Sequence, residues 1–261
     1  MFKRLAQEGS RYLQQVRHLQ PPSEQLLYRF ASAPDLDRWR VFTDSEWGGS
    51  STATLAHATA DTAVLSGQIS RELQDPEAKG RLIRSGLCGL VCKEPPDAED
   101  LDAFDQLVVR IKSDGRKYIV NVREDNWVVG DQSHDIWQSF LFGRPGEWQE
   151  VVLPFSRFLL TWKGKLVETK SRMSPQRITS IGIALAGGDA LQPQGPFSLG
   201  LDWGALHRAS LANKVQELSG TLTAYLFTKQ SGGALLGQRG AYCSKYRSSS
   251  DEMRNLWQWA N

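Results

Sequence analysis

The residues best suited to nucleophilic chemistry are Ser50 and Ser51, which follow a glycine pair and stand shortly before His57. A serine hydrolase needs a serine hydroxyl held against an imidazole base, and the chain has four histidines to supply one. The stretch Gly48-Gly49-Ser50-Ser51 lacks the Gly-x-Ser-x-Gly elbow. His57 also lies too near in sequence to match the known orders of triad residues. We therefore favour a structural glycine turn over a hydrolase site.

A second set of reactive side chains consists of Asp131, His134 and Asp135, which offer oxygen and nitrogen ligands for a metal ion. One loop with three such residues is more typical of a solvated face. The sequence contains neither a Gly-x-Gly-x-x-Gly motif nor a Walker loop, so nucleotide cofactors have no support. Pairs of carboxylates can be drawn at will from 29 acidic residues, and without geometry they indicate nothing. We expect no catalytic residue, no cofactor and no metal ligand.

Aromatic residues offer a binding chemistry instead of a reactive one. Trp127, Trp137, Trp148 and Trp162 could form a platform on which sugar rings stack. In an all-β protein the same residues are more typical of the packed core, which we favour. A carbohydrate-binding module remains the alternative function.

Composition restricts the class of protein further. The formal charge of +2 gives no field that would concentrate nucleic acid, so we expect no nucleic-acid partner. No apolar run reaches the length of a membrane-spanning helix, which favours a soluble or at most peripheral protein. Cys88, Cys92 and Cys243 are sparse and odd in number, which suits a reducing compartment. On one strand Cys88 and Cys92 would lie about 13 Å apart, too far for a disulfide, so we expect buried thiols.

The elements that must position these residues are mostly strands, because turn signals recur at short intervals from residue 64 onward. The pattern predicts a short helix over 23–30, an irregular stretch around Trp39 and Phe42, and a long connection over 161–176. It predicts strands over 64–70, 83–93, 106–112, 117–123, 136–142, 148–153, 178–185 and 197–203. Eight or so antiparallel strands predict an all-β sandwich or jelly roll.

Two turns stand out within this pattern. Asp114-Gly115 tolerates the positive φ angles of a tight turn and predicts an antiparallel hairpin between the strands on either side. Pro154 ends a strand, and Phe155 and Phe158 are placed to plug one end of the core.

We expect three parts in the chain. Residues 1–30 form a presequence-like or helical segment, 31–209 the jelly-roll domain and 210–261 an appendage of low order, rich in Gly, Ser and Ala. The N-terminus carries basic residues at helical spacing with apolar ones. That pattern fits an organelle transit peptide and equally an ordinary surface helix.

Eight short motifs occur in one order over residues 34–206. They are Asp44-x-x-x-Gly48-Gly49-x-Ser51, Leu65-Ser66-Gly67, Ser85-Gly86-Leu87-Cys88, Asp114-Gly115-Arg116-x-Tyr118-x-Val120-Asn121, Trp148-Gln149-x-Val151-x-Leu153-Pro154-Phe155-x-x-Phe158, Lys163-Gly164, Ile178-x-Ser180-Ile181-Gly182 and Gly195-Pro196-Phe197-x-Leu199-x-Leu201-Asp202-Trp203. In this order they resemble the complex I intermediate-associated protein 30 family. Gly204, in place of the family's usual strand ending, and the tail after residue 209 depart from the pattern.

The resemblance implies a galactose-binding-like jelly roll and a non-enzymatic role in the assembly of mitochondrial complex I, NADH:ubiquinone oxidoreductase. It implies a location in the mitochondrial matrix, peripheral to the inner membrane. The implied partners are an acyl-CoA-dehydrogenase-like flavoprotein, an Ecsit-like adaptor and membrane-arm subunits of complex I. The motif residues that we expect to be structural are Asp44, Gly48, Gly49, Ser51, Asp114, Gly115, Trp148, Pro154, Phe155 and Phe158.

Overall fold

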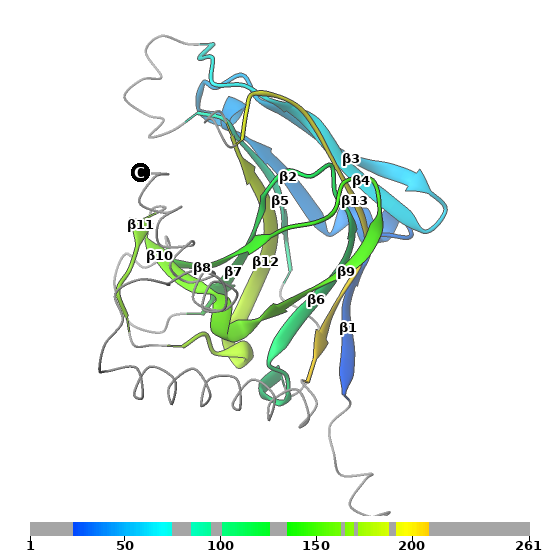
Figure 1. The fold of residues 1–261 in the computed structure, drawn as a ribbon, viewed down its shortest axis with the longest axis vertical. Helices are drawn as coiled ribbons and strands as arrows, with labels where there is room; N and C mark the ends of the chain where they lie inside the picture. The colour runs from blue at the N-terminus through cyan, green and yellow to red at the C-terminus, as the bar shows by residue number, and fades with distance from the viewer. Residues whose placement is uncertain are drawn as a thin grey trace, which may run out of the picture.

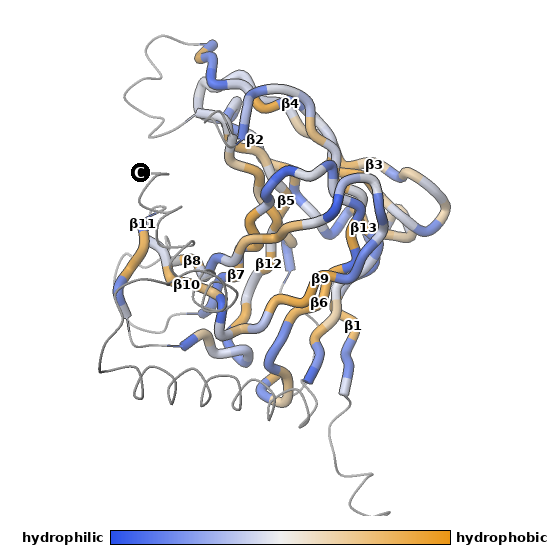
Figure 2. Tube along the Cα trace, viewed as in Figure 1, coloured by the Kyte–Doolittle hydropathy of each residue, from blue (hydrophilic) through white to orange (hydrophobic). Residues whose placement is uncertain are grey.

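The protein folds into two antiparallel sheets packed face to face (Figure 1). This is a computed structural model that describes residues 23–74, 85–94, 101–125, 135–162, 165–169, 172–187 and 192–208. The all-β sandwich expected from the sequence is confirmed. Hydrophobic residues concentrate in the strands, and hydrophilic stretches mark several strand ends (Figure 2). In the described ranges no helix is long and apolar enough to cross a membrane.

Sheet A has six strands in the order β3-β4-β13-β6-β9, with β1 also paired to β13. Its strands are β1 (Glu24–Arg29), β3 (Thr52–Thr59), β4 (Thr62–Ile69), β6 (Gln106–Lys112), β9 (Trp148–Pro154) and β13 (Gly195–His207). On one side of β13, residues 195–201 pair with β4 and residues 203–207 with β1. On the other side, residues 200–207 pair with β6. Sheet A is therefore organised around β13, the last of the strands in the described ranges.

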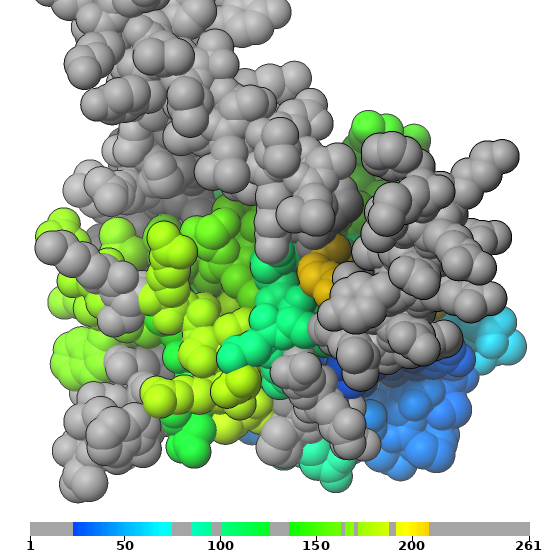
Figure 3. All heavy atoms as spheres, turned by 90° about the horizontal axis from the view of Figure 1, so that it is seen from below, coloured from blue at the N-terminus to red at the C-terminus, as the bar shows by residue number. Residues whose placement is uncertain are grey.

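Sheet B has seven strands in the order β11-β10-β8-β7-β12-β5-β2. They are β2 (Trp39–Thr43), β5 (Leu87–Cys92), β7 (Tyr118–Glu124), β8 (Asp135–Leu141), β10 (Leu159–Trp162), β11 (Lys165–Leu166) and β12 (Ile178–Ala186). Short helical turns connect the strands: α2 (Ala33–Asp37), η1 (Asp44–Trp47), η3 (Leu101–Ala103), η4 (Phe155–Arg157) and η5 (Pro175–Arg177). From below, the blue N-terminal residues and the yellow-green residues lie on opposite sides of the molecule (Figure 3).

The core lies between the sheets and is filled by alternate residues of the central strands. Leu199 of β13 and Ile111 of β6 are fully buried on the sheet A side, and Val120 of β7 on the sheet B side. An aromatic cluster closes one side: the rings of Tyr28 and Phe30 each lie 5.0 Å from that of Trp39.

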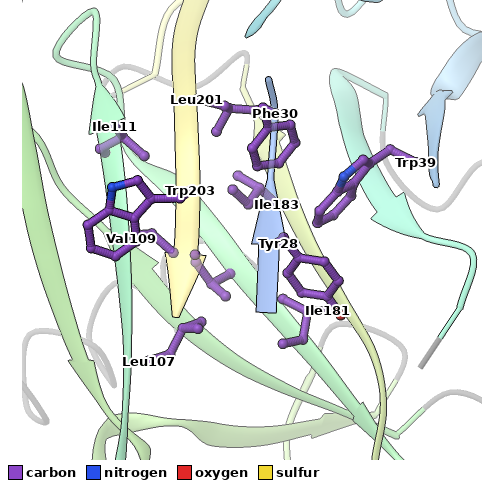
Figure 4. A pocket seen from close by; sticks show the side chains of 12 residues that line it. Tyr28, Phe30, Trp39, Leu107, Val109, Ile111, Ile181, Ile183, Leu201 and Trp203 are labelled. Carbon is purple, nitrogen blue, oxygen red and sulfur yellow. The ribbon is translucent and has the colours of Figure 1, made fainter. Parts of the chain in front are cut away.

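A cavity of about 20 Å³ remains beside the aromatic cluster, with aliphatic side chains of both sheets around it (Figure 4). Such a volume has room for about one water molecule. Ligand sites usually enclose about 300–1,000 Å³. This cavity between the described strands is therefore too small for a ligand and is a gap in the packing.

Three sequence expectations about local structure are wrong. The helix expected over 23–30 is strand β1, because its backbone pairs with β13 and buries Leu27 and Tyr28, so the sandwich begins upstream of the boundary expected at residue 31. The irregular stretch around Trp39 and Phe42 is strand β2. The connection expected over 161–176 contains the end of β10 and all of β11.

The hairpin expected at Asp114-Gly115 is also wrong. Gly115 does adopt a positive φ of 91°, as a tight turn requires. However, β6 pairs with β9 and β13 in sheet A, whereas β7 pairs with β8 and β12 in sheet B. The turn therefore crosses from one sheet to the other, and two neighbouring strands end on opposite faces of the core.

Candidate functional site

The motif that begins at Asp44 forms a buried hydrogen-bonded node. The Asp44 side chain is fully buried, and its Oδ1 accepts a hydrogen bond from the backbone N–H of Ser51 at 2.9 Å. Its Oδ2 accepts from the backbone N–H groups of Gly86 at 2.5 Å and Leu87 at 3.4 Å. The Ser51 hydroxyl lies 3.1 Å from the same Oδ2 and 3.0 Å from the Ser70 carbonyl oxygen. One carboxylate thus joins η1, the start of β3 and the segment that enters β5.

The glycines of this motif are required by close approach and by backbone conformation. A Cβ atom on Gly49 would lie 2.3 Å from the Asp44 carboxyl carbon, far inside contact distance. Gly48 ends η1 with a φ of 95°, which is the left-handed region that favours glycine. Gly86 has a φ of 86°, and its carbonyl accepts from the N–H of Gly187 at 2.8 Å. The motif is therefore built to enclose one carboxylate.

The node does not have the geometry of a hydrolase. The Ser50 hydroxyl bonds to the Ser70 hydroxyl at 2.9 Å and to the Glu72 carbonyl at 2.8 Å. Ser51 is fully buried, and its hydroxyl donates a hydrogen bond to the Asp44 carboxylate. His57 lies further along the same strand, about 20 Å from Ser51 at the usual rise per residue. Ser50 and Ser51 are therefore not brought together with His57.

The thiol of Cys88 lies near the node and is not reactive. Cys88 and Cys92 are buried and free, as expected from their spacing on one strand. Burial, with the negative charge of Asp44 nearby, raises the pKa of the Cys88 thiol to about 12. A thiol with so high a pKa carries almost no thiolate at neutral pH and is not a nucleophile.

A second, more exposed node surrounds Asp114 at the crossover between the sheets. Its Oδ1 accepts from the backbone N–H of Arg116 at 3.0 Å, and its Oδ2 accepts from that of Ser198 on β13 at 2.8 Å. The Arg116 guanidinium lies 3.8 Å from Oδ2 and also donates to the carbonyl oxygens of Pro193 and Pro196. The crossover is therefore fastened to the beginning of β13.

The Trp148 to Phe158 motif has one exposed and one buried end. Trp148 is 38% exposed, and its ring lies beside Gly200, where a Cβ atom would be 3.1 Å from it. Pro154 is the last residue of β9, and the turn that follows buries Phe155 and Phe158 with ring centres 6.2 Å apart. This motif spans sheet A from its surface to the end of the core.

Of the four tryptophans that could form an aromatic platform, the three that the structure describes do not form one. Trp137 is buried in the core at 6% exposure, as the packing interpretation expects. Trp148 and Trp162 are exposed at 38% and 42%, so for these two the packing interpretation is wrong. They stand on different sheets, Trp148 on β9 and Trp162 on β10. Sugar-ring stacking on several coplanar rings is not available from these three.

The outer face of sheet A carries a row of apolar residues, which we call the outer row. Leu26, Ala205, Val108 and Val152 are neighbours across four strands. Leu26 and Val152 are 41% and 45% exposed at the two ends of the row. Val108 and Ala205 are buried in its middle, yet they are absent from the cluster between the sheets. Exposed apolar surface of this kind is typical of an interaction site.

Charged residues border the outer row. Arg110 lies between β9 and β13, opposite Glu150 in the register, and its Nε is 3.4 Å from Oδ2 of Asp202. Trp148 lies one row beyond, beside Lys112. Apolar residues, a tryptophan and an arginine together are the composition found at protein–protein contacts.

A pocket of about 310 Å³ lies at the side of the sandwich and was not predicted from the sequence. Residues of α2, β2 and β3 form it, with Asp37 and His57 as the ionisable groups in its lining. Two signals could have revealed it. Ser32 and Asp35 have the spacing of a capping box at the start of α2, and Thr52-Ala53-Thr54-Leu55 alternates polar and apolar residues at the start of β3.

Several sequence-predicted residues lie outside the described ranges. They are Trp127, Asp131, His134, Cys243 and the segment 210–261, and of Asp135 only the backbone is described. Within the described ranges, no group of three or more His, Cys, Asp or Glu side chains could hold a metal ion.

Comparison with solved structures gives similarity to bacterial carbohydrate-binding modules. A family 11 module from Clostridium thermocellum covers 72% of this chain and 96% of its own, with 16% identity and a TM-score of 0.49. A family 30 carbohydrate-binding module aligns with 10% identity and a TM-score of 0.41.

Comparison with protein families and curated proteins is more specific. The family model for complex I intermediate-associated protein 30 matches residues 28–201. The protein named "Complex I intermediate-associated protein 30, mitochondrial" from Mus musculus is 31% identical over 186 residues, 68% of this chain and 54% of the mouse protein. The Drosophila melanogaster protein of the same name is 28% identical over 210 residues, 76% of this chain and 69% of its own.

The fold and the two aspartate nodes define an antiparallel β-sandwich in which the motif carboxylate of Asp44 is buried and that of Asp114 is partly exposed. The chain belongs to the complex I intermediate-associated protein 30 family. The match spans about half the length of the mouse relative.

Proposed function

We propose that this protein assists the assembly of mitochondrial respiratory complex I by binding other proteins and without catalysing a reaction. The observation that carries the proposal is the family match over residues 28–201, which takes in both aspartate nodes and eleven of the described strands, β2 to β12, completely. The mitochondrial names of the relatives support the location. We place the protein in the matrix, peripheral to the inner membrane.

The partners follow from the same proposal. We expect an acyl-CoA-dehydrogenase-like flavoprotein, an Ecsit-like adaptor and intermediates of the complex I membrane arm. The outer row is the surface that we assign to one of these contacts, because its two ends are exposed and charged residues border it. In this role the protein would shield apolar surface of an unfinished subunit until the next module docks.

Depletion of the protein followed by separation of respiratory complexes on native gels tests the proposal. We expect less mature complex I and an accumulated subassembly, both restored by the wild-type chain. Normal complex I with no stalled subassembly would overturn the proposal.

A matched pair of variants tests the surface. Val152→Glu places a charge in the outer row, whereas Phe142→Glu places one on another exposed apolar residue, on the loop after β8, with 53% exposure. We expect both variants to fold and only Val152→Glu to leave assembly impaired. Equal rescue by both would exclude the outer row as the contact surface.

A further inference from the structure

The strand β3 ends sheet A on one side, and among the described residues no strand pairs with its second edge. It is eight residues long and contains neither a charged residue nor a proline. Only Ala53 and Leu55 are partly buried, and the other six residues are exposed. Along such an edge every second residue directs its N–H and C=O groups away from the sheet. Another extended backbone would satisfy that row of donors and acceptors in place of water.

The other edges of the described sheets are protected. Glu150 lies in the middle of β9 and Pro154 at its end. Glu24 and Arg29 stand at the two ends of β1, Arg40 lies within β2, and β11 is only two residues long. Charge, proline and short length are the usual ways in which edge strands avoid pairing with other chains. The edge of β3 has none of these protections.

The pocket of about 310 Å³ lies directly inside this edge. The blue residues around α2 and the cyan residues of the β3–β4 hairpin lie side by side there (Figure 3). Leu55 and His57 of β3 both line it, so alternate side chains of this strand point into the pocket. A strand added to β3 would direct alternate side chains the same way.

The lining of the pocket indicates which side chain fits. Leu36, Val41 and Leu55 form apolar walls, and the carboxyl group of Asp37 is the acidic group among the lining residues. Lysine and arginine have a long apolar stem and a positive end, so they match both parts.

We propose that the free edge of β3 binds an extended segment of a partner protein by strand addition, with a lysine or arginine of that segment in the pocket beside Asp37. Main-chain hydrogen bonds would supply the affinity, and the pocket would supply the specificity, as in other cases of β-strand addition. The inference rests on the proposed function only in taking the protein to act by binding other proteins.

Synthetic peptides of about nine residues, long enough to pair with β3, test the proposal. Their sequence alternates threonine and valine, with a central lysine in one peptide and a central glutamate in the other. A third peptide repeats the lysine sequence with alternate backbone nitrogens methylated on the side that would face β3. Binding to the full chain is measured by NMR titration, with amide hydrogen exchange of β3 as the second readout.

We expect the lysine peptide to bind, with shifts concentrated in β3 and slower exchange at alternate residues of that strand. The glutamate peptide is expected to bind about tenfold more weakly. The methylated peptide is expected not to bind, because it cannot donate to the edge.

Charge reversal at the pocket sharpens the test. The variant Asp37→Lys should lose about tenfold in affinity for the lysine peptide and gain for the glutamate peptide. The side chain of Asp37 takes no part in the capping box of α2, so the fold should persist. Asp61→Lys makes the same charge change at the exposed turn between β3 and β4 and should leave both affinities unchanged.

Four results would overturn the proposal. They are no binding of the lysine peptide up to about 1 mM, equal binding of the methylated peptide, shifts that map to another edge, and a concentration-dependent dimer formed through β3. Complex I assembly in depleted cells is scored separately. Normal complex I in the absence of the protein would remove the proposed function and leave the peptide result standing.

Discussion

Asp44 and Asp114 stand at the start of two glycine-containing turns, and both accept hydrogen bonds from backbone N–H groups. Asp44 is fully buried, and hydrogen bonds from neutral groups surround its carboxylate. Asp114 is 21% exposed and has the Arg116 guanidinium beside it. The comparison shows that the same side chain fastens loops in two ways. A buried carboxylate needs hydrogen-bond donors from the protein for both of its oxygens. Near the surface, a neighbouring cation and solvent stabilise the carboxylate as well.

The largest expected effect follows from removing the buried carboxylate. Asp44→Ala should lower the free energy of unfolding by about 4 kcal/mol, because it leaves several buried N–H groups without an acceptor. Urea denaturation followed by tryptophan fluorescence measures the change. Asp44→Asn, which keeps one acceptor oxygen, should lose about half as much. A loss below about 1 kcal/mol for Asp44→Ala would show that the node is not essential to the fold.

Steric exclusion around Asp44 should give the next largest effect. Gly49→Ala would place a Cβ atom 2.3 Å from the Asp44 carboxyl carbon, and we expect a loss of about 3 kcal/mol. Gly204→Ala is the matched control, since its nearest neighbour would be Val109 at 3.6 Å, beside the small core cavity. That control should be neutral or slightly stabilising in the same urea-denaturation assay. Equal losses in both variants would mean that any added methyl group is harmful here.

The more exposed node should give a smaller effect. Asp114→Ala should cost about 1–2 kcal/mol, because solvent can reach part of the site and replace the lost acceptor. The Asp114 and Arg116 side chains interact, so Asp114→Ala should cost less in a protein that already carries Arg116→Ala. A double-mutant cycle measures this difference, which is the interaction free energy of the pair. If Asp114→Ala costs as much as Asp44→Ala, burial does not explain the difference between the nodes.

The carboxylate of Glu124 should have the smallest effect on the free energy of unfolding, and that effect should depend on pH. Burial raises the pKa of Glu124, whose carboxylate accepts hydrogen bonds from the N–H of Ser174 and the indole of Trp137. A raised folded-state pKa means that the native state holds a proton more tightly, so stability falls as pH rises from the ordinary value of 4.5 through the raised one. Glu124→Gln should flatten this fall in unfolding curves measured between about pH 4 and pH 8. An unchanged pH profile would assign the dependence to other groups.

The sequence correctly predicted those segments whose own residue pattern is enough to make them strands. Leu107, Val109 and Ile111 alternate with Gln106, Val108, Arg110 and Lys112, and β6 has the bounds that this alternation predicts. The segment that became β1 has Leu26, Leu27 and Tyr28 in succession, which is not an alternating pattern. Its strand state comes from pairing with β13, a partner that lies far away in the sequence.

The site was less predictable because its contacts are distant in the chain. The Asp44 motif was identified from its residue types, but its partners Gly86 and Leu87 follow from the fold alone. The glycine at position 115 indicated a turn and could not indicate which sheet the next strand joins. The β3 edge and its pocket depend on where two sheets end, which no local pattern specifies.

The central place of β13 has a consequence for how the protein is made. Strands β1, β4 and β6 all pair with β13, and all three leave the ribosome before it does. Sheet A therefore cannot close on the nascent chain until residues 195–207 have emerged. Contacts between strands so far apart in sequence favour slow folding and long exposure of unpaired edges. A growing chain of this protein should therefore depend on molecular chaperones until β13 has emerged from the ribosome.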